Sequence, residues 1–169
     1  MRPVVVLVEG ESDALAVRLL AQRRGLDVEV VAMGGVTNAR RYAATRAGSA
    51  TLLGLCDAGE RRYLENLEPP LDGVFVCDRD LEEELVVALG AEAVLEVLAE
   101  TGLIGSFRTF QGQPEWRRRD LTAQVCRFAG AGSGRKALLA GAMAARLEPA
   151  RVPASLAALL DAAQAALRR

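Results

Sequence analysis

The sequence contains no histidine, a single lysine and only 4% aromatic residues. Its three cysteines, Cys56, Cys77 and Cys126, form no CxxC pair. These absences exclude a structural zinc site of the usual kind and any mechanism that depends on histidine. No apolar run approaches the roughly 18 residues of a membrane span, and the first apolar segment runs into Glu9 rather than into a cleavage site. We therefore expect a cytoplasmic protein with no membrane contact.

The charged residues are unevenly distributed along the chain. Residues 1–100 carry 10 basic and 18 acidic side chains, a net charge of −8, whereas residues 101–169 carry 11 basic and 4 acidic ones, a net charge of +7. An acidic half suits a divalent cation, and a basic half suits a polyanion such as nucleic acid. Mutual neutralisation of two faces of the fold explains the same split equally well.

Short apolar runs alternate with amphipathic stretches in the first half of the chain. The runs are too short and too rich in valine for helices, so they predict four buried strands, at residues 3–8, 28–32, 51–56 and 73–77. Ser12 or Asp13 can begin a helix that ends near Gly25, and Thr37 or Asn38 can begin another. Strands separated by helices predict a parallel sheet in an α/β fold.

The second half of the chain has mostly helical patterns. Residues 80–104 are expected to be helical, with a break near Gly90, and Pro114 can start a helix that runs to Phe128. Two more helices are expected, from Gly134 to Leu147 and from 156 to 167. At 169 residues the chain can bury a sizeable core. It predicts one domain, with an α/β metal-binding core in residues 1–90 and a helical, basic part in residues 91–169.

Acidic residues follow three of the four expected strands. Since the carboxyl ends of parallel strands meet at one edge of a sheet, these side chains should gather there and repel one another unless a cation is present. Oxygen ligands without histidine or cysteine favour Mg²⁺ or Mn²⁺. The alternative is that each acid only caps the helix that follows it. The acids in question are Glu9, Asp13, Asp57, Asp78, Asp80 and Glu82.

Three segments resemble a known family, the TOPRIM domain of the overcoming-lysogenization-defect (OLD) nucleases. They are Val8-Glu-Gly-Glu-Ser-Asp13, Leu55-Cys-Asp-Ala-Gly59 and Asp80-Leu-Glu82, and Gly134-Arg-Lys136 matches a late lysine of that domain. The resemblance covers most of the chain. It implies a TOPRIM-like fold and a nuclease that uses two Mg²⁺ or Mn²⁺ ions, with DNA as the expected substrate.

The same resemblance implies a role for each matched residue. Glu9 corresponds to the motif glutamate and Asp13 to its partner on the next helical turn. Asp57 corresponds to the first acid of the central motif, and Asp80 and Glu82 to the ligands of the second ion. The expected catalytic residues are Glu9 and Lys136.

One departure from the family pattern concerns the central motif. Where Asp-x-Asp is usual, this chain has Asp57-Ala-Gly59, so one carboxylate is missing unless Glu60 or Asp78 replaces it. The ATPase domain of OLD proteins is also not part of this sequence. A second hypothesis is therefore a non-catalytic module that binds metal and nucleic acid together with a separate ATPase chain or another partner. Oligomerisation is left open.

Basic residues of the second half could contact nucleic acid. Lys136 is the only lysine, and a lysine offers a compact charge that arginine does not. Trp116 stands next to an arginine run, a combination typical of surfaces that bind a phosphate backbone. A solvated helix face and a chance surface lysine are the alternatives. The candidate arginines are Arg117, Arg118, Arg119, Arg127 and Arg135.

Overall fold

The computed structural model describes residues 2–169, except for the side chain of Ser133. Its centre is a four-stranded, fully parallel sheet in the order β2-β1-β3-β4. The strands are β1 (Val4–Val8), β2 (Glu29–Ala32), β3 (Thr51–Asp57) and β4 (Gly73–Cys77). All four strands therefore lie where the apolar runs predicted them, and the α/β fold class is confirmed.

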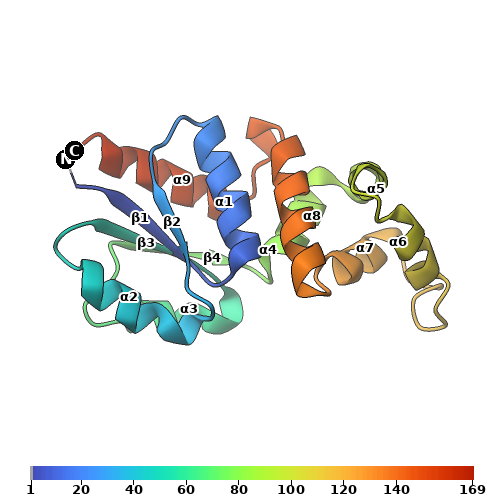
Figure 1. The fold of residues 1–169 in the computed structure, drawn as a ribbon, viewed down its shortest axis with the longest axis horizontal. Coiled ribbons are helices and arrows are strands. Elements are labelled where there is room, and N and C mark those ends of the chain that lie inside the picture. The colour runs from blue at the N-terminus through green and yellow to red at the C-terminus, as the bar shows by residue number, and fades with distance from the viewer. Residues whose placement is uncertain (1) are drawn as a thin grey trace.

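Helices cover both faces of this sheet (Figure 1). On one face lie α2 (Ala39–Arg46) and α3 (Arg61–Glu65), and on the other lie α1 (Glu11–Arg23) and α9 (Ala154–Leu167). Side chains along β1 alternate between the two cores, because Val5 and Leu7 pack under α2 while Val6 and Val8 pack under α1. The sequence did not predict α3, which is too short to show a helical period.

The other helices extend the molecule beyond the carboxyl edge of the sheet (Figure 1). They are α4 (Leu81–Leu89), α5 (Ala91–Glu100), α6 (Ile104–Gln111), α7 (Leu121–Ala129) and α8 (Ser133–Arg146). The predicted break at Gly90 is confirmed, since its φ of +92° is a conformation that side chains disfavour. Three short 3₁₀ turns, at Val36–Asn38, Ala58–Glu60 and Pro149–Arg151, complete the chain. Within residues 2–169, every helix is too short or too polar to cross a bilayer.

The helix predicted from Pro114 to Phe128 is wrong in its first half. Residues 113–119 form turns, and α7 begins only at Leu121, with the side chain of Asp120 accepting the N–H of Ala123 at 2.9 Å. The buried amide of Gln124 donates to the carbonyl of Trp116 at 2.7 Å and to that of Arg119 at 3.1 Å. These bonds hold the backbone in a non-helical path, because the side-chain donor takes up carbonyl groups that would otherwise accept the backbone hydrogen bonds of a helix.

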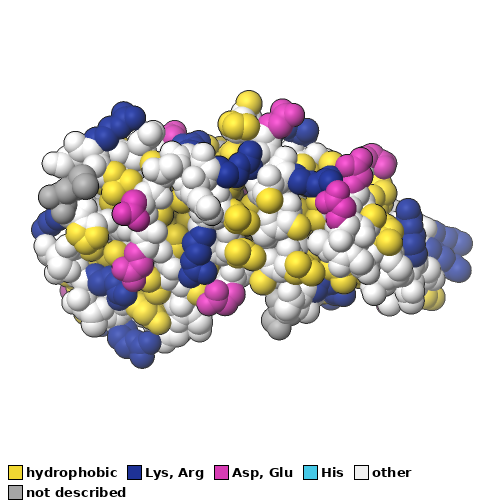
Figure 2. Space-filling view, turned by 45° about the horizontal axis from the view of Figure 1, so that its top comes forward, with side chains coloured by type: hydrophobic (Ala, Val, Ile, Leu, Met, Phe, Trp, Pro, Cys, Tyr) yellow, Lys and Arg dark blue, Asp and Glu magenta, His cyan; other side chains and the backbone are white. Residues whose placement is uncertain are grey.

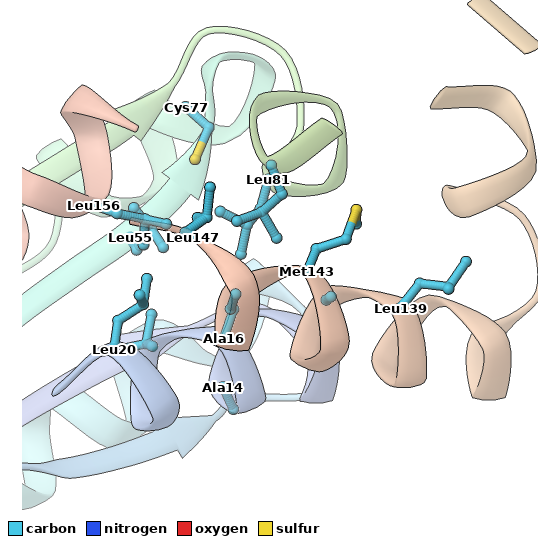
Figure 3. Close-up of a cluster of buried hydrophobic side chains, with 14 of the residues drawn as sticks. Ala14, Ala16, Leu20, Leu55, Cys77, Leu81, Leu139, Met143, Leu147 and Leu156 are labelled. Carbon is cyan, nitrogen blue, oxygen red and sulfur yellow. The ribbon is translucent and has the colours of Figure 1, made fainter. Parts of the chain in front are cut away.

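Helices α1 and α8 pack closely against each other above the sheet. A Cβ atom on Gly141 of α8 would lie 2.6 Å from the side chain of Leu15 on α1, so the two helices approach each other closely at this glycine. Figure 3 shows Met143 of α8 and Leu147, which follows α8, in the same buried cluster as Ala14 of α1. This contact brings the start of α1 and the start of α8 to the carboxyl edge of the sheet.

Candidate metal centre

Three of the predicted carboxylates meet at the carboxyl edge of the sheet. Glu9 follows β1, Asp57 ends β3, and Asp13 lies on the first turn of α1. Together with apolar side chains such as Leu81 they line a hollow of about 10 Å³. A volume of this size is near the smallest that holds one water molecule. The hollow therefore has the size and the lining for a single small ligand.

The turn between β1 and α1 orients Asp13. Helix α1 begins at Glu11 with Gly10 as its N-cap, not with Ser12 or Asp13 as the sequence suggested. The N–H of Gly10 donates to Oδ2 of Asp13 at 3.0 Å. The Asp13 carboxylate therefore reaches back over the helix start toward the strand ends.

The pKa values of these carboxyls are raised by burial and by their neighbours. Burial raises the pKa of Asp13 to about 6 against the opposing hydrogen bond from Gly10, and the charges of Glu82 and Glu9 add to the increase. Burial also raises the pKa of Asp57 to about 7, with the charges of Asp13 and Asp80 as further causes. The acids are thus close enough to destabilise one another's charged forms.

Glu60 joins this cluster, and Asp78 does not. The 3₁₀ turn Ala58–Glu60 places Glu60 beside Glu9, and burial together with the Glu9 carboxyl raises the pKa of Glu60 to about 7. Its Oε2 atom is buried with no hydrogen-bond partner among the described residues. Asp78 is exposed and lines a different hollow, between α4 and the start of α9. Of the two replacements considered for the missing acid, Glu60 lies beside Glu9 and Asp78 does not line that hollow.

Asp80 has the capping role that the sequence offered as an alternative. Its Oδ1 atom accepts the N–H of Glu83 at 2.7 Å, at the N-terminus of α4. Its charge still contributes to the raised pKa of Asp57. Asp80 therefore stabilises α4 and adds negative charge to the edge at the same time.

Glu82 and Lys136 form an ion pair next to the carboxylates. Lys136 Nζ lies 3.0 Å from Glu82 Oε2, and the Glu82 side chain is 1% exposed while that of Lys136 is 33% exposed. Burial lowers the pKa of Lys136, but the hydrogen bond and charge of Glu82 outweigh it, so the net pKa is raised. The lysine is therefore charged and faces the acidic edge. Sequence reasoning placed both residues at the site but missed their pairing, which depends on how α8 docks on α4.

Solved structures that resemble this fold include C-terminal regions of OLD proteins. The region from Xanthomonas campestris pv. campestris has a TM-score of 0.68 and 21% identity, covering 99% of this chain and 97% of that one. The region from Burkholderia pseudomallei has a TM-score of 0.66 and 15% identity, covering 99% of both chains. This chain has the fold of an OLD C-terminal region. The resemblance to the OLD TOPRIM domain is thereby confirmed as a fold over nearly the whole chain.

At these identities the likeness concerns the fold alone. No protein-family model matches the sequence, and no curated protein matches it. The roles of individual residues in the OLD-like fold therefore rest on the geometry of this chain.

The side chains at the carboxyl edge of the sheet have the chemistry that a hard divalent cation prefers. All the candidate donors are carboxylate oxygens, and burial raises the pKa of the adjacent Cys56 thiol to about 12, which keeps it protonated. Mutually raised carboxyl pKa values mean that a cation would relieve repulsion there. Within residues 2–169, however, no group of three or more acidic or cysteine side chains is arranged as a finished metal site. To bind an ion, the carboxylates would have to move closer together than they lie in this structure.

The five candidate arginines do not form one surface in the OLD-like fold. The Arg135 guanidinium lies 4.1 Å from the centre of the Phe128 ring, and its Nε donates to the carbonyl of Ala131 at 2.9 Å. Arg135 is thus packed against its own helix start. Arg119 and Arg127 line a groove with Trp116, whereas Arg117 and Arg118 do not line it.

Proposed function

We propose that this chain is a divalent-metal-dependent nuclease that hydrolyses phosphodiester bonds, with DNA as the first substrate to test. The observation that carries the proposal is the meeting of Glu9, Asp13 and Asp57 around one hollow at the carboxyl edge of a parallel sheet. Ligands of open α/β sheets bind at this edge. The OLD-like fold supports the same class of activity.

The residues divide into two sets of candidate ligands. Glu9, Asp13 and Asp57 would hold one Mg²⁺ or Mn²⁺ ion, with Glu60 close by. Asp80 and Glu82 would serve a second ion. Two bound ions supply an activated water and positive charge beside the attacking and leaving oxygens of the phosphodiester.

Lys136 is the proposed source of further positive charge. Its pairing with Glu82 holds the ammonium at the acidic edge, beside the candidate carboxylate ligands. A preorganised cation stabilises the negative charge that develops on the phosphate during hydrolysis. Glu9 is the other proposed catalytic residue, because its carboxyl interacts with both Asp13 and Glu60 and so lies at the centre of the cluster.

A non-catalytic function has one observation in its favour. Asp80 already caps α4 and Glu82 already pairs with Lys136, so both residues of the second set are engaged. A single ion held by the first set would allow binding of metal and nucleic acid without turnover. In that case the chain would act with a separate ATPase or another partner.

Cleavage of plasmid and of labelled single-stranded DNA over a titration of Mn²⁺ and Mg²⁺ tests the proposal. Glu9→Gln should lower the cleavage rate by at least about 100-fold. Mutating a residue that merely hydrogen-bonds to a metal ligand already lowers metal affinity or activity about 10–100-fold, and Glu9 is a proposed ligand itself. Glu11→Gln is the matched control, since Glu11 is exposed, lies two residues away and contacts Arg18 instead. Equal rates for wild type and Glu9→Gln would refute the assignment. Metal binding without any cleavage would establish the non-catalytic function.

A further inference from the structure

A groove of about 520 Å³ begins beside the carboxylate edge and is separate from the hollow that Glu9 lines. One wall is the start of α4, including Asp80, and the opposite wall is α7, including Arg127. The turn before α7 contributes Trp116 and Arg119. Asp80, which lines this groove, also contributes to the raised pKa of Asp57, so this wall of the groove borders the proposed metal site.

Trp116 is a supported aromatic surface in this groove. Its ring centre lies 5.1 Å from that of Phe110, which in turn packs 5.6 Å from Phe128 in the core. The indole is half-buried, so part of it stays open to the groove. A ring that is already held in place loses little freedom when a further ring stacks on it.

The turn that carries Trp116 is anchored by a buried polar side chain. Gln124 is 5% exposed and donates to the carbonyls of Trp116 and Arg119, while its own oxygen accepts from Nε2 of Gln111 at 2.6 Å. The amide nitrogen thus holds the turn, and the amide oxygen ties Gln124 to the end of α6. The tryptophan and the arginine are therefore presented together, in a defined position.

Two of the three arginines that line the groove have no ion-pair partner within residues 2–169. Arg119 and Arg127 are both exposed, and neither contacts a carboxylate. Arg79, on the opposite wall, is instead neutralised by Glu83. Figure 2 shows dark blue side chains gathered at the end of the molecule, over α6 and the loop after it. The α7 side of the groove thus offers two free guanidinium groups next to an open aromatic face.

We propose that this groove binds single-stranded nucleic acid, with one base stacked on Trp116 and flanking phosphates on Arg119 and Arg127. An aromatic surface combined with cations is how proteins hold an unpaired strand without reading its sequence. Bases inside a duplex already stack on both faces, so a duplex has no free face for Trp116. The inference rests on the proposed nuclease function only in one respect, namely that the bound strand would continue from the groove to the carboxylate edge.

The test uses the intrinsic fluorescence of Trp116, the only tryptophan in the chain. The full chain in EDTA, which prevents cleavage, is titrated with a fluorescein-labelled oligothymidine of about 12 nucleotides, within the range that such grooves cover. Tryptophan emission should be quenched as fluorescein anisotropy rises. A hairpin duplex of the same length should bind more weakly and quench less. Binding without quenching, or equal quenching by the duplex, would overturn the proposal.

Variants separate stacking from charge. Trp116→Ala should weaken oligothymidine binding about tenfold, and Trp116→Phe, which keeps an aromatic ring, should weaken it less. Arg119→Ala with Arg127→Ala should reduce the slope of log affinity against log salt by about 1.4, the share of two phosphates on a single strand. Arg40→Ala with Arg168→Ala removes the same charge at exposed positions outside the groove and should leave the slope within error. Equal slopes for the two double variants would refute the groove.

Failure of this inference is distinguishable from failure of the proposed function. Quenching in EDTA without cleavage under any metal condition would support the groove and refute the nuclease. Metal-dependent cleavage without quenching by oligothymidine would support the nuclease and refute the groove.

Discussion

Lys136 Nζ lies 3.0 Å from Oε2 of Glu82, a carboxylate with only 1% of its side chain exposed. The pair joins the start of α8 to the first turn of α4. Apart from the Lys136 ammonium, neither oxygen of Glu82 has a polar partner within residues 2–169, so the ammonium is the main compensation for this buried charge. The single lysine therefore has a structural role in addition to the catalytic one proposed for it.

Loss of the lysine should destabilise the fold. Lys136→Ala should lower the free energy of unfolding by about 3 kcal/mol, the lower end of the range for an orphaned buried charge, because Lys136 is itself one-third exposed. Urea denaturation in EDTA measures the change. Adding Glu82→Gln to Lys136→Ala should restore part of the loss, since no charge then remains to be buried. A Lys136→Ala variant as stable as wild type would contradict the structural role.

Replacement by arginine should separate stability from activity. Lys136→Arg can keep an ion pair with Glu82, so its free energy of unfolding should stay within about 1 kcal/mol of wild type. Its single-turnover cleavage rate should nevertheless fall about 100-fold, because a planar guanidinium cannot replace a compact ammonium close to the reacting phosphate. A wild-type cleavage rate in this variant would refute the catalytic role of Lys136, and the proposed mechanism would then depend on the carboxylates alone.

The stability of the metal-free protein should fall as pH rises. Asp13, Asp57 and Glu60 titrate near pH 4 in an unfolded chain but have pKa values of about 6, 7 and 7 when folded. Between about pH 4 and pH 7 the folded state therefore binds more protons, and the free energy of unfolding decreases with pH. Thermal melts in EDTA should give a higher Tm at pH 5 than at pH 8. Asp57→Asn should flatten this dependence, and an unchanged dependence in that variant would show that other groups cause it.

Divalent metal should reverse the loss of stability at high pH. A cation that binds only the folded state adds about 2.7 kcal/mol to the free energy of unfolding at 100 times its dissociation constant. Millimolar Mg²⁺ or Mn²⁺ at pH 8 should therefore raise the Tm relative to EDTA. The increase should be lost in Glu9→Gln with Asp57→Asn and kept in Glu11→Gln. If no increase occurs in wild type, the metal centre is refuted.

The strands and the acids that follow them were predictable because their signals are local. Five apolar residues rich in valine before Glu9 favour a buried strand, and parallel strands bring their carboxyl ends together in any such sheet. The turn at 113–119 was not predictable in the same way. It depends on Gln124 reaching two carbonyls, and nothing in the pattern distinguishes an amide that faces a turn from one that faces solvent.

The sequence by itself determined the fold class, the supply of oxygen donors and the absence of histidine chemistry, since these follow from periodicity and residue type. Only the tertiary structure decided which acids meet. It placed Glu60 beside Glu9, kept Asp78 apart, and set Lys136 against Glu82. The physical reason is that these contacts depend on long-range packing: the pairing of β1 with β3 brings Glu60 to Glu9, and the docking of α8 on α4 brings Lys136 to Glu82. Residues more than fifty positions apart become neighbours where strands pair and helices pack closely, as α8 does on α1 at Gly141, and no local pattern records such packing.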